Sequence, residues 1–141
     1  KFDAAADYVV KGSFGTKTAS VDAGADARDV AKSFNLIAGT TGVNATTITR
    51  AKITSISAAD TYSFTLQGKS KTASTVNATV TSTSNVTALK DAINSVSGAT
   101  GITASLTEDL SGINLVQAEG YDIIVGDVTA ATANAATYLD A

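Results

Sequence analysis

Hydrophobic residues recur every three or four positions in two short stretches of the chain, residues 27–37 and 89–96. The apolar positions are Ala27, Val30, Ala31, Phe34 and Ile37 in the first stretch and Leu89, Ala92, Ile93 and Val96 in the second. This spacing places the apolar side chains on one face of an α-helix. Asp26 and Asn85 precede the two stretches and are residue types that cap helix N-termini. The pattern therefore predicts two short amphipathic helices, each with one buried face.

Strand-like alternation surrounds both predicted helices. Aromatic and β-branched residues around Gly12, Gly15 and Gly68 predict a hairpin before each helix. After the first helix, we expect a strand at Val43–Thr49 that continues to about residue 56 and returns through Tyr62–Leu66. After the second, we expect a strand at Ile102–Leu106, a second through residues 112–117, and a return through Tyr121–Val125.

A repeated phrase follows each predicted helix. Residues 38–47 read AGTTGVNATT, and residues 97–106, at an offset of 59 residues, read SGATGITASL. The positions that carry the repeat are Phe34, Asn35, Gly39, Thr41, Gly42 and Ala45 in the first copy and Ile93, Asn94, Gly98, Thr100, Gly101 and Ala104 in the second. We expect Gly39 and Gly98 to take the left-handed conformation that ends a helix.

The repeat extends upstream at a different offset and defines the predicted organisation. Residues 7–20 align with residues 61–74, and Tyr8 matches Tyr62. The sequence thus predicts an α+β fold of two repeated ββα-plus-hairpin units, with antiparallel sheets that each pack a short helix on one face. The units span about residues 7–56 and 61–125. Residues 126–141 are either a helix from about Thr129 or a linker to the rest of a parent chain.

The composition excludes several classes of function. The 141 residues contain no His and no Cys, which removes a Ser-His-Asp triad, an HExxH zinc site and a thiolate nucleophile. Net charge is −3, and the ten basic residues are scattered, which argues against nucleic-acid binding. No apolar run reaches the ~20 residues of a membrane span. We therefore expect no enzyme activity, no cofactor, and neither a nucleic-acid nor a membrane partner.

The remaining candidates for chemistry have ordinary structural explanations. Glu108 and Asp109 could act as an acid–base pair or bind a cation, but their sequence LTEDLSG is typical of a turn. Asp122 and Asp127 lack the spacing of a calcium loop, and the glycines form no phosphate-binding motif. We therefore predict no catalytic, cofactor-binding or metal-binding residues. Tyr8 and Tyr62 are expected to pack within the fold rather than to stack on a sugar.

Hydroxyl-bearing residues are dense between Thr72 and Thr87. They could carry O-linked glycans, or they could reflect the preference of threonine for solvent-facing strands. The sequence favours the second interpretation for any one residue and leaves the identity of modified residues unknown.

The helix and the phrase after it resemble the flagellin hook-IN repeat of bacterial flagellins and related axial proteins. The residues that carry the resemblance are Asp91–Asn94 and Thr100–Ala104, with the first-copy counterparts Lys32–Asn35 and Thr41–Ala45. The strand-like segments SFTLQG and GYDIIV also resemble the family. The likeness covers about residues 7–125. The first copy has Phe-Asn where the family usually has Ile-Asn, and the long terminal helices that form the filament core are absent.

The resemblance implies the variable outer region of a flagellin. Such a region is extracellular, lies on the surface of the flagellar filament and associates with other flagellin subunits through parts of the parent chain not present here. It would set the surface properties of the filament and contact neighbouring outer regions. The same repeat in a filament cap or hook-associated protein is the nearest alternative. A surface adhesin or carbohydrate-binding module that binds host or surface glycans is a further one.

Overall fold

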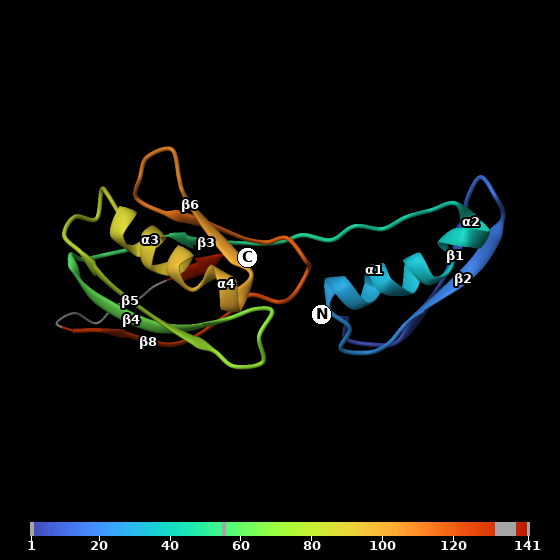
Figure 1. Cartoon of the computed structure of the whole chain (residues 1–141), viewed down its shortest axis with the longest axis horizontal. Helices are drawn as coiled ribbons and strands as arrows, with labels where there is room; N and C mark the ends of the chain where they lie inside the picture. Colours follow the sequence, from blue (N-terminus) through green and yellow to red (C-terminus); the bar gives the residue numbers. More distant parts are fainter. Residues whose placement is uncertain (1, 55, 132–137, 141) are drawn as a thin grey trace. The chain divides into compact units, whose positions relative to one another are not determined.

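The computed structural model describes residues 2–54, 56–131 and 138–140, and has the predicted α+β composition (Figure 1). The chain divides into two compact units. Unit 1 consists of Lys1–Ile48 with Glu119–Tyr121, and unit 2 consists of Thr49–Ala118 with Asp122–Ala141.

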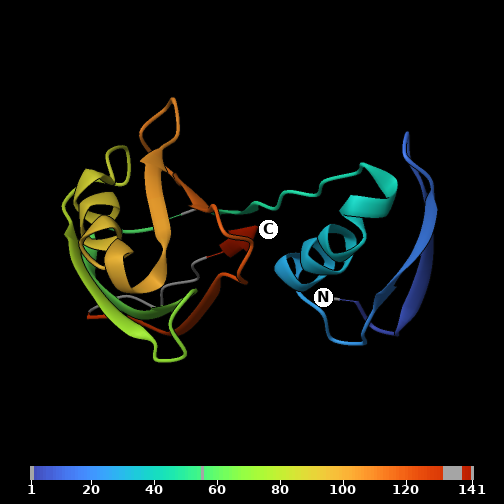
Figure 2. The same cartoon turned by 45° about the vertical axis from the view of Figure 1, so that its right-hand side comes forward.

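Unit 1 is a two-stranded antiparallel ribbon with a helix on one face (Figure 2). Its elements are β1 (Ala6–Lys11), β2 (Thr16–Val21), α1 (Ala27–Leu36) and α2 (Ala38–Thr41). Ala19 and Val21 of β2 are buried, together with Ala31 of α1. The backbone N–H of Asp29 donates to Asp26 Oδ1 at 2.9 Å, so the predicted N-cap of the first helix is confirmed.

Unit 2 contains two antiparallel sheets and a second helix pair. The elements are β3 (Thr49–Thr54), β4 (Asp60–Gln67), β5 (Ser74–Val80), α3 (Thr87–Ser95), α4 (Ser97–Thr100), β6 (Ile102–Leu106), β7 (Ile113–Gln117), β8 (Ile124–Ala130) and β9 (Tyr138–Asp140). One sheet has the strand order β6-β7-β3-β9 and the other has the order β5-β4-β8. The helix α3 packs against β5 of one sheet and β6 of the other.

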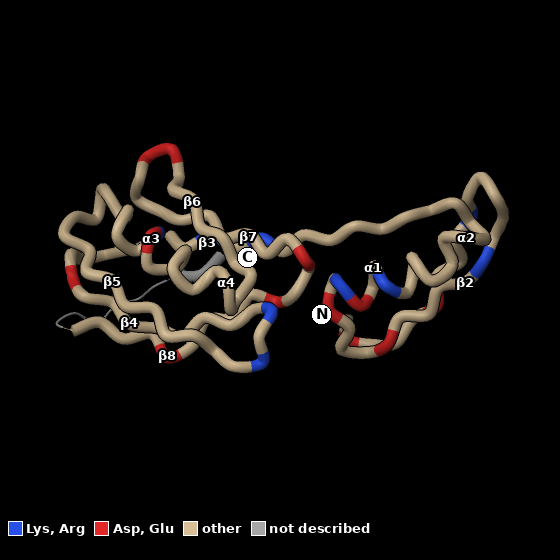
Figure 3. The backbone as a smooth tube through the Cα atoms, in the orientation of Figure 1, with Lys and Arg blue, Asp and Glu red and all other residues tan. Residues whose placement is uncertain are grey.

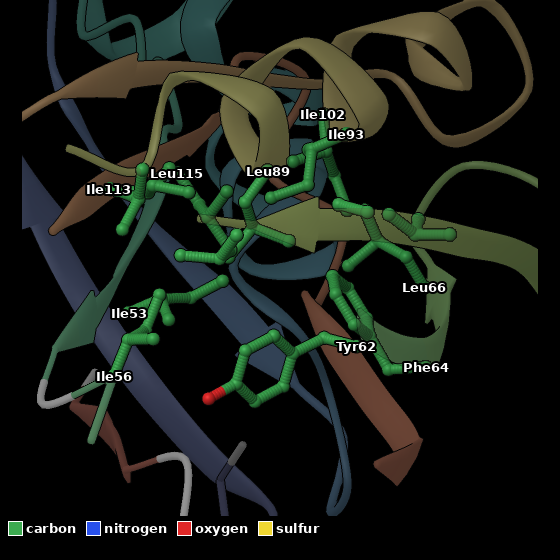
Figure 4. Packing of buried hydrophobic residues seen from close by; sticks show 14 of the residues in the cluster. Ile53, Ile56, Tyr62, Phe64, Leu66, Leu89, Ile93, Ile102, Ile113 and Leu115 are labelled. Atoms are coloured by element: carbon green, nitrogen blue, oxygen red, sulfur yellow. The ribbon is translucent and has the colours of Figure 1, made fainter. Parts of the chain in front are cut away.

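The core of unit 2 forms where these sheets and α3 meet (Figure 4). Leu89 and Ile93 of α3 are 2% and 0% exposed, as the helical periodicity predicts. Strand β4 alternates strictly, and its inward residues Tyr62, Phe64 and Leu66 are all buried. The packing of Tyr62 within the fold is thereby confirmed.

Two of the predicted strand returns are wrong. Among the described residues, 43–48 form no strand, and β3 pairs with β7 and β9 instead of turning back onto β4. The segment predicted at Tyr121–Val125 becomes a strand only from Ile124, and β8 pairs with β4 rather than β7. Alternation shows which face of a strand is apolar but not which strand it pairs with. The observed register sets Ile53 of β3 opposite Ile113 of β7, and both are buried.

The helix expected from about Thr129 is wrong for the part that the structure describes. Thr129 and Ala130 belong to β8, and Tyr138–Asp140 form β9 at the edge of the other sheet. The rest of this prediction falls on residues 132–137 and 141, which lie outside the described residues.

The predicted helix ends are displaced by three residues. Gly39 and Gly98 lie inside α2 and α4, and the left-handed C-caps are Gly42 with φ 74° and Gly101 with φ 68°. The cause is an extra helical turn after Ile37 and Val96. At the start of α3, Val86 occupies the N-cap position, and Asn85 Oδ1 accepts from the Thr87 N–H at 3.1 Å.

Alanine substitutions should distinguish the helical glycine, Gly98, from the left-handed C-cap glycine, Gly101. Gly98→Ala should raise the free energy of unfolding by about 0.5–1 kcal/mol, because Gly98 is helical and its Cβ position is open. Gly101→Ala should lower it by about 1–2 kcal/mol, because an L-residue is strained at φ 68°. Denaturant unfolding of the two variants tests the assignment, and a gain in stability for Gly101→Ala would contradict it.

Candidate functional site: the helix–strand clamp

The side chain of Asn94 joins α3 to the strand β6. Its Nδ2 donates to the Ala104 carbonyl at 2.9 Å, and its Oδ1 accepts from the Ala104 backbone N–H at 2.8 Å. The amide thus acts as donor and acceptor toward one residue, using two separate polar atoms. We call this pair of hydrogen bonds the helix–strand clamp.

Unit 1 contains the same clamp. Asn35 Nδ2 donates to the Ala45 carbonyl at 2.9 Å, and the Ala45 N–H donates to Asn35 Oδ1 at 2.7 Å. The segment that Asn35 holds forms no strand, so the clamp there positions extended backbone without a sheet to support it. The repeated Asn and Ala positions therefore have the same local geometry in both units.

A buried threonine closes the helical turn before each clamped segment. Thr100 Oγ1 donates to the Val96 carbonyl at 3.0 Å and accepts from the Ile102 N–H at 3.2 Å. Thr41 makes the corresponding bonds to Ile37 at 3.0 Å and from Val43 at 3.2 Å. Both threonines are fully buried, so these bonds satisfy polar groups that would otherwise be costly.

The hairpin before each helix closes on this same threonine. The Lys69 N–H donates to the Thr100 carbonyl at 2.8 Å, and the Phe14 N–H donates to the Thr41 carbonyl at 3.3 Å. A Cβ on Gly68 would overlap the Thr100 carbonyl oxygen. A Cβ on Gly12 would lie even closer to the Thr41 carbonyl oxygen. The hairpin glycines Gly12 and Gly68 thus permit backbone-to-backbone contact.

The two copies differ at the apolar position next to the clamp. Ile93 is completely buried, whereas Phe34 is half-buried and its ring lies 6.0 Å from that of Tyr8. Tyr8 is 37% exposed and also contacts the Phe2 ring, at 6.3 Å. Of the repeated positions, Gly39 and Gly98 have no neighbouring atom within 4 Å of the place that a Cβ would take, so they contribute nothing to the clamp.

The acidic pair Glu108–Asp109 lies in the turn between β6 and β7. Asp109 accepts from Thr107 Oγ1, from Ser111 Oγ at 2.7 Å and from the Ser111 N–H at 3.3 Å. The Thr107 hydroxyl, followed by Ser111, lowers the pKa of the Asp109 carboxyl to about 2. A carboxyl with this pKa is ionised at neutral pH and cannot act as a general acid there, so it serves as a fixed acceptor that organises the turn.

The Asp109 turn makes a testable pH prediction. The pKa of Asp109 in the folded state is below the unfolded value of about 3.9. The ionised carboxylate therefore stabilises the folded state above about pH 4, and this contribution is lost as pH falls toward 2. Thr107→Val should raise the Asp109 pKa in an NMR titration, and Ser111→Ala should raise it less. An unchanged pKa in Thr107→Val would contradict this explanation.

The other acidic residues singled out in the sequence lie apart from the Asp109 turn. Within the described ranges, no group of three or more potential metal ligands occurs. Asp127 Oδ2 accepts from Thr65 Oγ1 at 3.4 Å. Basic side chains are spread over separate elements of both units (Figure 3). No helix in the described part of the chain is long and apolar enough to cross a membrane.

An apolar cavity of about 150 Å³ lies in unit 2. It is lined by Ile53, Ile56, Tyr62, Phe64, Leu89, Val125 and Val128. Its one hydroxyl, that of Tyr62, already donates to the Ala58 carbonyl at 2.7 Å. A ligand site normally places a few free polar groups to orient its ligand, so this cavity is better explained as part of the core.

Replacement of the clamp amide tests its role. Asn94→Asp keeps the acceptor for the Ala104 N–H but removes the donor and places a carboxylate against the Ala104 carbonyl. We expect a loss of about 1–3 kcal/mol in the free energy of unfolding and faster amide exchange at Ala104. The matched variant Asn35→Asp should lose less, because Asn35 is exposed and Asn94 is half-buried. Equal stability of Asn94→Asp and the unmodified chain would refute the clamp's importance.

Comparison with known protein families places the clamp of unit 2 inside a recognised motif. Residues 63–119 match the family model described as the flagellin hook IN motif. The match runs from within β4 through β5, α3, α4, β6 and β7, and so contains Asn94, Thr100 and Ala104. Unit 1 contributes only Glu119 to this range. Comparison with curated protein sequences gives no match. Residues 63–119, most of unit 2, are therefore similar to the flagellin hook IN motif.

Proposed function

We propose that this chain is a surface-exposed outer region of a flagellar filament subunit. The observation that carries the proposal is the flagellin hook IN match at residues 63–119, which includes the helix–strand clamp of unit 2. In this role the region would set the surface chemistry of the filament and contact the outer regions of neighbouring subunits, outside the cell.

The use of the polar side chains supports a structural role. The Nδ2 and Oδ1 atoms of Asn94 and the hydroxyl of Thr100 are hydrogen-bonded to backbone groups. Polar groups whose hydrogen bonds are all made within the fold position the backbone and are not available to bind a substrate. We therefore propose that the chain has no catalytic activity and needs no cofactor.

We further propose that unit 1 is a second copy of the same repeat. The supporting observation is the matching set of bonds made by Asn35 and Thr41 on one side and by Asn94 and Thr100 on the other. By sequence the repeats would span about residues 7–56 and 61–125, although β3 of the first repeat pairs with β7 in unit 2 and residues 126–130 belong to β8. A solved structure of unit 1 without the Asn35–Ala45 bonds would contradict this.

The solvent face of β5 offers candidates for O-glycosylation. Thr75 and Thr79 are exposed there and alternate with the buried Val76, Ala78 and Val80. If glycans decorate this face, mass spectrometry of native filaments should find modified peptides that contain these threonines. If all of these peptides are unmodified, the glycosylation of this face of β5 is contradicted.

Deletion of residues 1–141 from the parent gene tests the proposed function. We expect filaments that are thinner by electron microscopy but still propel the cell, because the assembling segments lie elsewhere in the parent chain. Loss of filaments, with monomer released into the medium, would instead assign the region to a filament cap or an assembly-critical contact.

A further inference from the structure

The two units differ in the number of strands beside their central strand. In unit 2, β4 is flanked by β5 on one edge and by β8 on the other. In unit 1, β1 occupies the position of β4, because Tyr8 aligns with Tyr62 and each strand is followed by its hairpin partner. Among the described residues, β1 pairs with β2 alone. The edge of β1 that corresponds to the β8 side of β4 is therefore open.

Open strand edges are templates for pairing with another chain. Proteins usually block such edges with charges that oppose a second strand or with a covering element. The edge strand β1 carries two charges, Asp7 and Lys11, at symmetric positions about Val9. Both are exposed, and neither has an ion-pair partner among the described residues.

This symmetric spacing makes the strand complementary to itself. If two copies of β1 run antiparallel with Val9 opposite Val9, each Asp7 lies opposite the Lys11 of the other copy. Opposite charges at directly opposed positions stabilise an antiparallel pair, and like charges destabilise it. Val9, which is 65% exposed in the single chain, would lie against its own counterpart at the centre.

The other face of β1 is compatible with the same register. Tyr8 would lie opposite Val10 of the second copy, an aromatic and β-branched pair of the kind that stabilises sheets. Tyr8 is 37% exposed in the single chain, which leaves surface for this contact. A shift of two residues in either direction would keep the faces but place one of the two charges opposite Val9 and lose both charge pairs.

We propose that a second copy of this chain is the partner of the open edge, and that β1 pairs antiparallel with β1 across a two-fold axis. The product is a four-stranded sheet of order β2-β1-β1-β2. The axis runs perpendicular to this sheet, so both α1 helices lie on one face. An isologous contact of this kind uses the same patch on both copies and closes at two.

Charge reversals at the two ends of β1 test the pairing. Single-chain and dimer populations of the 141-residue protein would be measured by sedimentation equilibrium at low salt, over a concentration series. We expect the unmodified chain to dimerise. Asp7→Lys places Lys opposite Lys at both ends, and Lys11→Asp places Asp opposite Asp, so each variant should raise the dimer dissociation constant about tenfold or more.

Two combinations of these substitutions test whether the effect is specific to charge pairing. The double variant with Asp7→Lys and Lys11→Asp should regain the dissociation constant of the unmodified chain, because the charges are exchanged but still complementary. A mixture of the two single variants should form a heterodimer that neither forms alone. Lys71→Asp, in the exposed segment between β4 and β5, matches the charge change of Lys11→Asp and should leave dimerisation unchanged.

Each other outcome would overturn the proposal. An unmodified chain that stays monomeric at all concentrations would show that Asp7 and Lys11 protect the edge instead of pairing it. Dimers that persist in both single variants would locate self-association elsewhere. Circular dichroism of each variant shows whether a lost dimer reflects lost charge pairing or lost folding.

In a filament, this contact would join the outer regions of neighbouring subunits, and in that respect it rests on the proposed function. The two remain separable by experiment. Sedimentation tests the pairing without reference to the filament, whereas deletion of the region tests the filament role without reference to β1.

Discussion

Ile93→Ala is expected to lower the free energy of unfolding of unit 2 by about 2–5 kcal/mol. Ile93 is fully buried on α3 and belongs to the cluster formed by the helix and both sheets (Figure 4). Removal of three carbon atoms there loses burial and leaves a cavity that the surrounding strands can fill only in part. Denaturant unfolding followed by amide exchange in α3 measures the loss.

Phe34→Ala at the matching position of unit 1 is the control for this prediction. Phe34 is half-buried and contacts Tyr8, so its truncation should cost less than that of Ile93 and should affect exchange in α1 rather than α3. If Phe34→Ala lowers the free energy of unfolding as much as Ile93→Ala does, the two side chains are equally important for packing. The inferred difference between the units would then be wrong.

Gly68→Ala is expected to cost about 1–3 kcal/mol, because the new Cβ would overlap the Thr100 carbonyl oxygen. The contacting atom is backbone, so the hairpin must move and the bond from the Lys69 N–H to Thr100 weakens. Unfolding experiments should show the loss, and amide exchange at Lys69 should accelerate.

Gly39→Ala is a matched substitution in open space. Gly39 lies in α2 and no atom lies within 4 Å of its Cβ position, so the variant should be at least as stable as the unmodified chain. A Gly68→Ala chain with undiminished stability would show that the hairpin does not need to approach the helix end so closely.

Local patterns in the sequence were sufficient to predict the two longer helices, α1 and α3, but not the short helices α2 and α4 that follow them. Spacing of apolar residues placed Leu89 and Ile93 in the core, and the Asp26 cap was predicted from residue type alone. Repetition also drew attention to Asn35 and Asn94, although it did not reveal which backbone groups they hold. A side chain ten residues from its partner leaves no periodic signal, so the clamp bonds became visible only in the structure.

Strand partners and helix ends could not be predicted in the same way. Alternation in β3 is compatible both with a return to β4 and with pairing with β7, and the structure shows the second, with the buried Ile53 opposite Ile113. The extra turn before Gly42 and Gly101 depends on Thr41 and Thr100 closing it from within. The strand pairing arises from tertiary contacts that no local window of sequence contains. The threonine bonds span only four residues, but residue type alone does not show that a threonine closes a further helical turn.

Surface labelling of assembled filaments tests the central claim most directly. The region contains no Cys, so Lys71→Cys adds one exposed thiol, in a parent protein otherwise free of reactive cysteine, while Ala78→Cys adds a buried one as control. Intact cells would be treated with a fluorescent maleimide and imaged. We predict label along the whole length of filaments that carry Lys71→Cys and little label with Ala78→Cys. Label confined to filament tips, or absent from filaments that contain the Lys71→Cys chain, would contradict a surface-exposed outer region of the filament subunit.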